Sequence, residues 1–178
     1  FGLFGPKSRD LLKTLSEDNF ENDQFKFGFA KFITIDGVKI WTQRLSYVGE
    51  LGYELYVDLK DAKKIYELLI EKGKDFNLSN CGMHAMDIMR MESGFLHWGH
   101  DISPEENQYQ AGLAFTISNK KDVDFIGKQA LEKIKQDKVK TRFSMFTLKE
   151  SEPGKPLLLH DEPIYDGEKI IGRSTSGN

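Results

Sequence analysis

The sequence has almost no cysteine, because Cys81 is the single one among 178 residues. One cysteine excludes an internal disulfide and any zinc or iron–sulfur site that needs several thiolates. It is compatible with a reducing compartment, and the bacterial cytoplasm and the mitochondrial matrix fit it equally well. Because a free cysteine behaves as a small hydrophobic side chain, we expect Cys81 to be buried in the core.

An excess of positive charge and long apolar runs are also absent. The chain has 25 Lys and Arg against 28 Asp and Glu, and its formal net charge is −3. Nucleic acid is therefore not an expected partner, because basic residues bind its phosphates. No apolar run approaches the roughly 20 residues that span a bilayer, so no membrane partner is expected either. The hydrophobic fraction of 39% still supplies enough apolar side chains for a folded core.

Common catalytic motifs are missing too. The sequence contains no GxGxxG or GxxxxGK[ST] loop to hold phosphates, and no GxSxG segment to present a serine nucleophile. The chain itself is therefore not expected to transfer hydride or phosphoryl groups.

Alternating strand and helix patterns predict an α+β fold. Asp36-Gly37 and Asp166-Gly167 are turn dipeptides between apolar runs, so each predicts a β-hairpin. Helices are expected after Pro6, from Asp61 to Lys72, at 84–93, and after a cap at Asp124. From Arg142 onward strands and turns prevail, which predicts a boundary near Lys138.

The segment HWGHD contains His97, His100 and Asp101, whose side-chain types are ligands of zinc and iron. A glycine lies between the histidines, and their spacing does not match the helical i, i+4 pair. We therefore favour a turn in which these side chains bond to backbone groups, with a metal site as the alternative. Asp87 and Arg90 lie three residues apart on a predicted helix and are interpreted as an exposed surface pair.

The segment SYVGELGYE, from Ser46 to Glu54, has two glycines that indicate a tight loop with a close backbone approach. Tyr47 offers a flat aromatic face and Glu54 a carboxylate. Together they suit a flat heterocycle with adjacent N–H donors. A glycine turn with a solvated Glu54 is the alternative that spacing alone leaves open.

SYVGELGYELYV resembles the central signature of the glycine-cleavage T-protein (aminomethyltransferase) family. GPKSRDLL, AMDIMRMESG followed by HWGHDIS, AGLAF and DFIGKQAL resemble further family motifs in the family order. HWGHDIS and DFIGKQALEKIK look most like the C-terminal folate domain of sarcosine and dimethylglycine dehydrogenases. In those enzymes a flavin domain oxidises an N-methyl amine, and the folate domain captures the released one-carbon unit.

The resemblance implies a site for tetrahydrofolate. Glu54 matches the carboxylate that grips the pterin edge, and Tyr47 matches the aromatic residue of the same signature. Phe115 stands where many members have Trp beside the folate tail. Met86 replaces a family Arg, a change that weakens or reorients pterin binding and again points to the dehydrogenase branch. The catalytic Asp of the family has no match here, so no catalytic residue is expected in this chain.

The resemblance also implies the domain organisation. Residues 1–137 would form incomplete folate-binding lobes, and residues 138–178 would begin a C-terminal β-barrel. We expect a fragment of a longer enzyme, itself inactive, with FAD only in a missing domain if the parent is a dehydrogenase. The expected function is one-carbon transfer to tetrahydrofolate, from an amine or from a lipoyl carrier protein. The alternatives are a relative that demethylates a sulfonium substrate and a non-catalytic folate-binding or assembly module.

Overall fold

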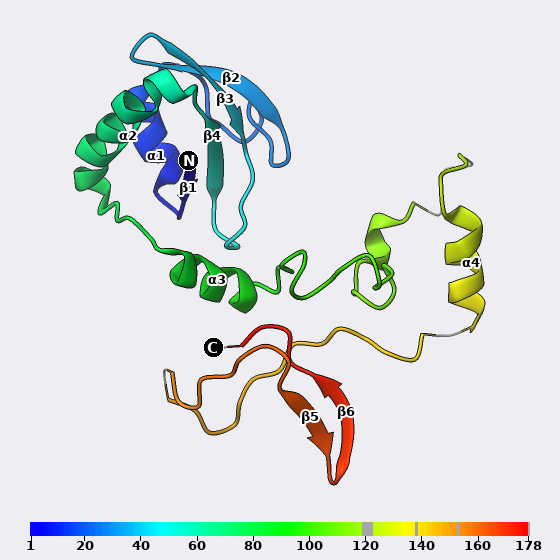
Figure 1. Cartoon of the computed structure of the whole chain (residues 1–178). Coiled ribbons are helices and arrows are strands. Elements are labelled where there is room, and N and C mark those ends of the chain that lie inside the picture. Colours follow the sequence, from blue (N-terminus) through cyan, green and yellow to red (C-terminus); the bar gives the residue numbers. More distant parts are fainter. Residues whose placement is uncertain (119–122, 138, 153, 178) are drawn as a thin grey trace. The chain divides into compact units, whose positions relative to one another are not determined.

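The computed structural model describes residues 1–118, 123–137, 139–152 and 154–177. These residues divide into two compact units, a first unit of Phe1–Phe95 and a second unit of Leu96–Asn178 (Figure 1). Each unit is described by itself. None of the described helices is long and apolar enough to cross a bilayer.

The first unit is built on an antiparallel sheet with the strand order β1-β4-β3-β2. The hairpin pattern around Asp36-Gly37 predicted β2 and β3 but not β1, which has only three residues and forms by pairing with β4. Helices α1 and α2 pack against one face of this sheet (Figure 1). The elements are β1 (Gly2–Phe4), α1 (Ser8–Leu15), β2 (Ala30–Ile35), β3 (Val38–Gln43), β4 (Gly52–Tyr56) and α2 (Leu59–Gly73).

The strands bury one face and expose the other, because successive side chains of a strand point to opposite sides. Ile33, Ile40 and Leu55 are buried against the helices, whereas Trp41 and Tyr56 remain accessible on the other face. The core also contains the buried leucines of α1 and the apolar stripe of α2. Its remaining members are Leu3, Leu11, Leu12, Phe20, Phe25, Ile35, Tyr53, Ile65 and Leu69.

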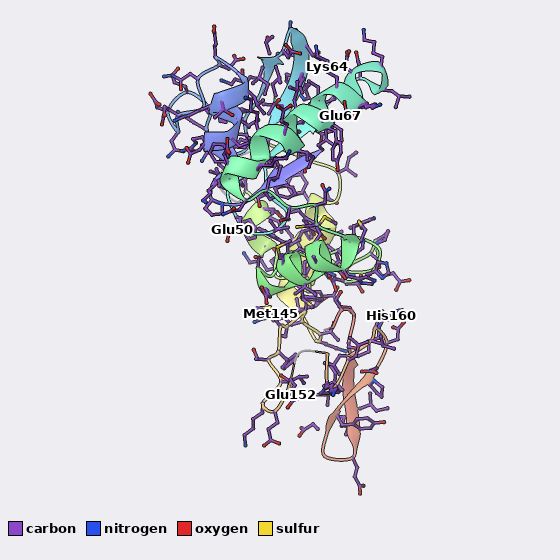
Figure 2. The ribbon with its side chains drawn as sticks, turned by 90° about the vertical axis from the view of Figure 1, so that its left-hand side faces the viewer. Glu50, Lys64, Glu67, Met145, Glu152 and His160 are labelled. Atoms are coloured by element: carbon purple, nitrogen blue, oxygen red, sulfur yellow. The ribbon has the colours of Figure 1, made fainter. Side chains whose placement is uncertain are left out.

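The predicted hairpin between β2 and β3 is confirmed. Asp36 and Gly37 have φ values of 45° and 76°, which is the left-handed pair that a two-residue type I′ turn requires. Lys64 of α2 (Figure 2) donates to the Asp36 carbonyl at 2.8 Å and pairs with its carboxylate at 2.8 Å. The turn is thus connected to the helix as well as to the strands.

Helix α2 begins at Leu59, so the prediction that Asp61 caps it is wrong. Asp58 has extended backbone angles, and Asp61 lies in the first turn with its N–H bonded to the Asp58 carbonyl at 2.9 Å. An acidic residue in the first turn still interacts favourably with the helix dipole. A short 3-10 turn, η1 (Lys74–Phe76), follows, and then α3 (Met83–Glu92), which matches the predicted helix at 84–93.

The second unit contains η2 (Ala114–Thr116), α4 (Lys128–Asp137), β5 (Pro163–Asp166) and β6 (Lys169–Arg173). The hairpin at Asp166-Gly167 is confirmed. Asp124 does not cap α4, because its carboxylate accepts the N–H of Phe125 before the helix begins. The boundary at position 138 lies outside the described residues. The division into 1–137 and 138–178 and the C-terminal β-barrel therefore stay predictions.

Candidate functional site

Glu54 lies on the sheet face that points away from α1 and α2. It is half-buried, and its Oε2 accepts a hydrogen bond from the Tyr56 hydroxyl at 2.5 Å. The two residues are neighbours on this face because they are two positions apart on β4. The hydrogen bond to Glu54 raises the pKa of the Tyr56 hydroxyl, since the phenol must stay protonated to donate. The bond lies at an exposed position, so the alternative of a glycine turn with a solvated Glu54 is still compatible with this arrangement.

Tyr56 continues into a row of exposed aromatic side chains. Trp41 faces Tyr56 across β3 and β4, and Phe32 faces Trp41 across β2 and β3. The rings of Phe32 and Trp41 meet edge to face, with centroids 4.9 Å apart. An open cavity of about 530 Å³ lies here. It is lined by Phe1, Phe32, Lys39, Trp41, Leu55, Tyr56, Val57 and Asp58, and neither Glu54 nor Tyr47 is among these residues.

Tyr47 lies on the loop that leads from β3 to β4. Its ring stacks on that of Phe95, with centroids 6.3 Å apart and an angle of 16° between the planes. The next residue, Val48, accepts a hydrogen bond from the Ser93 hydroxyl through its carbonyl at 3.1 Å. Tyr47 and Glu54 thus belong to the same unit, and the end of α3 holds the loop that carries Tyr47.

The two glycines of the SYVGELGYE segment are both required by the fold. Gly49 has a φ of 78°, and a Cβ there would collide with the Ser93 side chain. A Cβ on Gly52 would come within 2.7 Å of the Leu45 carbonyl oxygen and would also collide with the Phe4 ring. The close approaches at these glycines are made to the chain's own residues, and the predicted approach of the backbone to the contents of an adjacent cleft stays a prediction.

Phe115 is the third residue that the resemblance assigns to the ligand site. It belongs to η2 in the second unit, and its ring is 83% exposed. The structure places Tyr47 and Glu54 together in the first unit, whereas Phe115 lies in the other one. The role of Phe115 beside a ligand stays a prediction.

Two expectations from the sequence are wrong. Cys81 is exposed and does not belong to the core, because it lies in the irregular segment before α3. Arg90 is not an exposed partner of Asp87, because only 2% of its side chain is accessible. Its Nε donates to Asp87 Oδ1 at 2.7 Å, and its Nη1 donates to the Phe95 carbonyl at 3.1 Å. Arg90 thus satisfies backbone at the end of α3, as basic residues in a last helical turn do.

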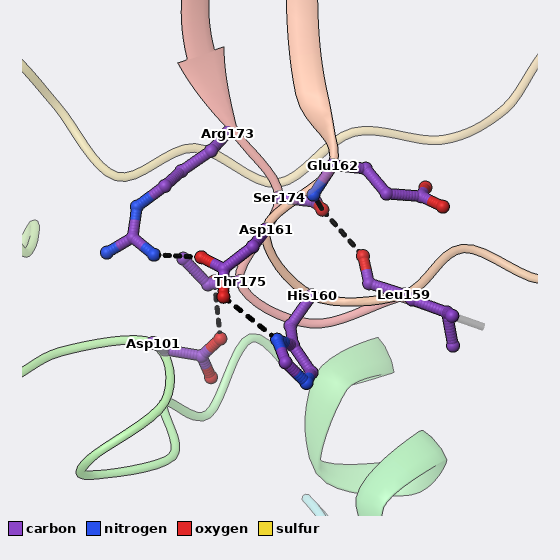
Figure 3. A network of polar contacts seen from close by, with 8 residues as sticks. All are labelled: Asp101, Leu159, His160, Asp161, Glu162, Arg173, Ser174 and Thr175. Carbon is purple, nitrogen blue, oxygen red and sulfur yellow. Dashed lines mark hydrogen bonds and ion pairs between the residues drawn. The ribbon is translucent and has the colours of Figure 1, made fainter.

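The HWGHD segment forms a turn in which Asp101 makes its predicted bond to backbone, whereas the bonds to backbone predicted for the two histidine side chains stay a prediction. Asp101 is buried, and its Oδ2 accepts the His97 N–H at 2.8 Å. Its Oδ1 accepts a hydrogen bond from the Thr175 hydroxyl at 2.6 Å (Figure 3). The Ser176 hydroxyl donates to the same oxygen at 2.7 Å. No local pattern indicates these two partners, because they lie far along the chain. Within the described ranges, no group of three His, Cys, Asp or Glu side chains is placed to hold a metal ion.

A second cavity, of about 290 Å³, adjoins this turn within the second unit. Asp161 lies at its wall and bonds to His160 Nδ1 at 3.0 Å and to the Arg173 guanidinium (Figure 3). The hydrogen bond from His160, followed by that from Arg173, lowers the pKa of the Asp161 carboxyl. The sequence analysis did not identify this polar cluster.

Comparison with known proteins relates almost the whole chain to an amine oxidase, amine dehydrogenases and aminomethyltransferases. It is 38% identical over 177 residues to 4-methylaminobutanoate oxidase (formaldehyde-forming) of Paenarthrobacter nicotinovorans, covering 99% of this chain and 21% of that protein. It is 33% identical to human mitochondrial dimethylglycine dehydrogenase, with 99% and 20% covered. An aminomethyltransferase of Halothermothrix orenii is 36% identical, with 99% and 47% covered. The chain thus spans about a fifth of the first two relatives.

A solved structure has the same fold. The glycine cleavage system aminomethyltransferase T from Bartonella henselae matches with a TM-score of 0.62 and 23% identity, covering 75% of this chain and 35% of that one. This similarity confirms the mixed α+β architecture. The profile of the GCVT N-terminal domain family matches residues 1–121. The resemblance carried by the SYVGELGYELYV signature is thereby confirmed, and the chain belongs to the family of the GCVT N-terminal domain.

Proposed function

We propose that the chain is a tetrahydrofolate-binding domain that serves one-carbon transfer. The observation that carries this proposal is the Glu54 carboxylate on the open sheet face of a GCVT N-terminal domain. Oε2 accepts the Tyr56 hydroxyl, and no described residue donates a hydrogen bond to Oε1. The carboxylate therefore keeps acceptor capacity for the N–H groups of a flat heterocycle.

The residues present fit the pterin ring system. Glu54 would accept its N–H groups, and the Tyr47 ring, positioned by Phe95, would supply an aromatic surface. Bound tetrahydrofolate supplies the amines that accept the one-carbon unit. The chain's own contribution is to bind and orient this group, because proximity of the reactants alone accelerates a reaction strongly. The described residues offer no match for the catalytic Asp, so the chain alone would be inactive.

The one-carbon donor and the cellular compartment are proposed from the relatives. The one-carbon donor would be either an N-methyl amine oxidised by a flavin domain outside this chain, or an aminomethyl group on a lipoyl carrier protein. The protein would work in the bacterial cytoplasm or in the mitochondrial matrix, and the human dimethylglycine dehydrogenase is a mitochondrial protein. Residues 138–178 would begin the C-terminal β-barrel that follows the folate-binding lobes.

Calorimetric titration of the full chain with tetrahydrofolate tests the proposal. Glu54→Gln removes the charge of the carboxylate and keeps its shape, so binding should weaken by about tenfold or more. Glu50→Gln is the matched control, because Glu50 (Figure 2) is an exposed glutamate in the adjacent loop. The affinity of the Glu50→Gln variant for tetrahydrofolate should equal that of the unchanged chain. Equal binding by the Glu54→Gln variant would contradict the role of Glu54, and no binding by the unchanged chain would contradict the function.

A further inference from the structure

We propose that Tyr56 is a positioning residue that holds the Glu54 carboxylate in the orientation needed to receive two adjacent N–H donors. This inference rests on the proposed function, since it concerns the same site. Neither the sequence motifs nor the family resemblance pointed to Tyr56.

The geometry of β4 supports this role. Glu54 and Tyr56 share one face of the strand, and the Tyr56 hydroxyl donates to Oε2 at 2.5 Å. A hydrogen bond to an ionised acceptor is short and about twice as strong as one between neutral groups. The bond uses one of the lone pairs of Oε2. The other lone pair and the whole of Oε1 remain for a ligand.

The tyrosine side chain lies at the surface of the sheet, 52% exposed. Trp41 pairs with Tyr56 across the strands, and the ring forms part of the wall of the aromatic cavity. A tyrosine has only two side-chain torsions. A neighbour on the facing strand therefore restricts the tyrosine hydroxyl more than it would restrict the polar end of a longer side chain. Glu54 has three torsions, and an unanchored carboxylate would lose rotational freedom on binding.

The cavity beside Tyr56 also contains charged side chains. They are Lys39 and Asp58, one cation and one anion. Lys39 lies over the Phe32 ring, with Nζ 4.4 Å from the ring centroid. Tyr56 is therefore the group that orders Glu54, and Lys39 is engaged elsewhere on the same face.

The consequence is a division of roles on β4. Glu54 contacts the ligand, and Tyr56 acts through Glu54. Tyr56→Phe keeps the ring and removes only the hydroxyl. We expect tetrahydrofolate binding to weaken by about three- to tenfold, a smaller loss than for Glu54→Gln, because the carboxylate remains but must be ordered by the ligand.

A double-mutant cycle separates positioning from a general structural role. In the Glu54→Gln background, Tyr56→Phe should change the affinity by less than twofold, because no charged acceptor is left to position. An equal loss in both backgrounds would overturn the inference. Tyr66→Phe is the matched control, since Tyr66 is a partly exposed tyrosine of α2 whose hydroxyl accepts a bond from Asn80. It should bind tetrahydrofolate as the unchanged chain does.

A spectroscopic measurement tests the pair without any ligand. The phenolate absorbance of the chain, minus that of the Tyr56→Phe variant, reports the ionisation of Tyr56 alone. Its midpoint should move to lower pH when Glu54→Gln is introduced, and an unmoved midpoint would overturn the inference. If the unchanged chain fails to bind tetrahydrofolate, the proposed function fails. The absorbance result then still decides whether Tyr56 is coupled to Glu54.

Discussion

The Asp101 carboxylate accepts a hydrogen bond from the Thr175 hydroxyl, 74 positions later in the chain, at 2.6 Å. The next residue, Ser176, donates to the same oxygen at 2.7 Å, and the other oxygen receives the His97 N–H. Asp101 thus joins the HWGHD turn to the segment that follows β6. Because Asp101 is only 4% exposed, this connection is made away from water.

Removal of the Asp101 carboxylate should destabilise the chain. Asp101→Ala leaves partly buried hydroxyls and an N–H without their acceptor, so the free energy of unfolding should fall by about 1–3 kcal/mol. Denaturant titration followed by circular dichroism measures the change. Asp101→Asn retains an amide oxygen for the two hydroxyls and should lose less. Asp137→Ala, an exposed change at the end of α4, should shift the unfolding free energy by less than about 0.5 kcal/mol.

Gly49 should tolerate no side chain. Its φ of 78° and the adjacent Ser93 side chain oppose a Cβ for two separate reasons. Gly49→Ala should therefore lower the free energy of unfolding by more than about 1 kcal/mol. Thermal unfolding compared with Gly82→Ala tests this, because Gly82 has an extended φ of −78° and open space around it. Equal stabilities of the two variants would contradict the explanation.

The loss of stability in Gly49→Ala has two causes, the left-handed backbone and the collision with Ser93, and they can be measured separately. Ser93→Ala removes the hydroxyl that meets the added Cβ, and it also removes the hydrogen bond to the Val48 carbonyl. The double variant should recover only part of the loss caused by Gly49→Ala, because the left-handed backbone remains. Full recovery would show that the collision alone is the cause.

The elements of the fold were largely predictable because local patterns determine them. The Asp36-Gly37 dipeptide specifies its own turn, and the leucine spacing of α1 specifies which face is buried. The start of α2 was predicted at Asp61 because an acidic residue in the first turn resembles a cap. Strand β1 could not be predicted, since three residues carry too little pattern and the strand depends on its pairing with β4.

The candidate site was predictable only in part. Tyr47 and Glu54 could be identified because they sit inside a continuous segment with two glycines. Tyr56 lies in that same stretch, but its relation to Glu54 depends on side-chain geometry that a sequence does not contain. The burial of Arg90 and the partners of Asp101 depend on residues elsewhere in the chain. Such tertiary contacts leave no periodicity in the sequence.

Acid should weaken the second unit through Asp161. His160 and Arg173 lower the pKa of this carboxyl, so the folded state binds a proton less readily than the unfolded state does. The stabilising contribution is complete above the ordinary pKa of an aspartate. It is lost as the pH falls through the lowered pKa of the folded state. The Asp161→Asn variant lacks this titrating carboxyl. Its free energy of unfolding should therefore fall less steeply as the pH is lowered through that range.

Carbon-detected NMR titration of the Asp161 carboxyl measures the same effect directly. Its midpoint should lie below that of an ordinary aspartate and should rise in His160→Ala, because the hydrogen bond from His160 is the largest cause of the shift. A smaller rise is expected for Arg173→Gln. A midpoint of Asp161 that stays unchanged in both variants would contradict the assignment.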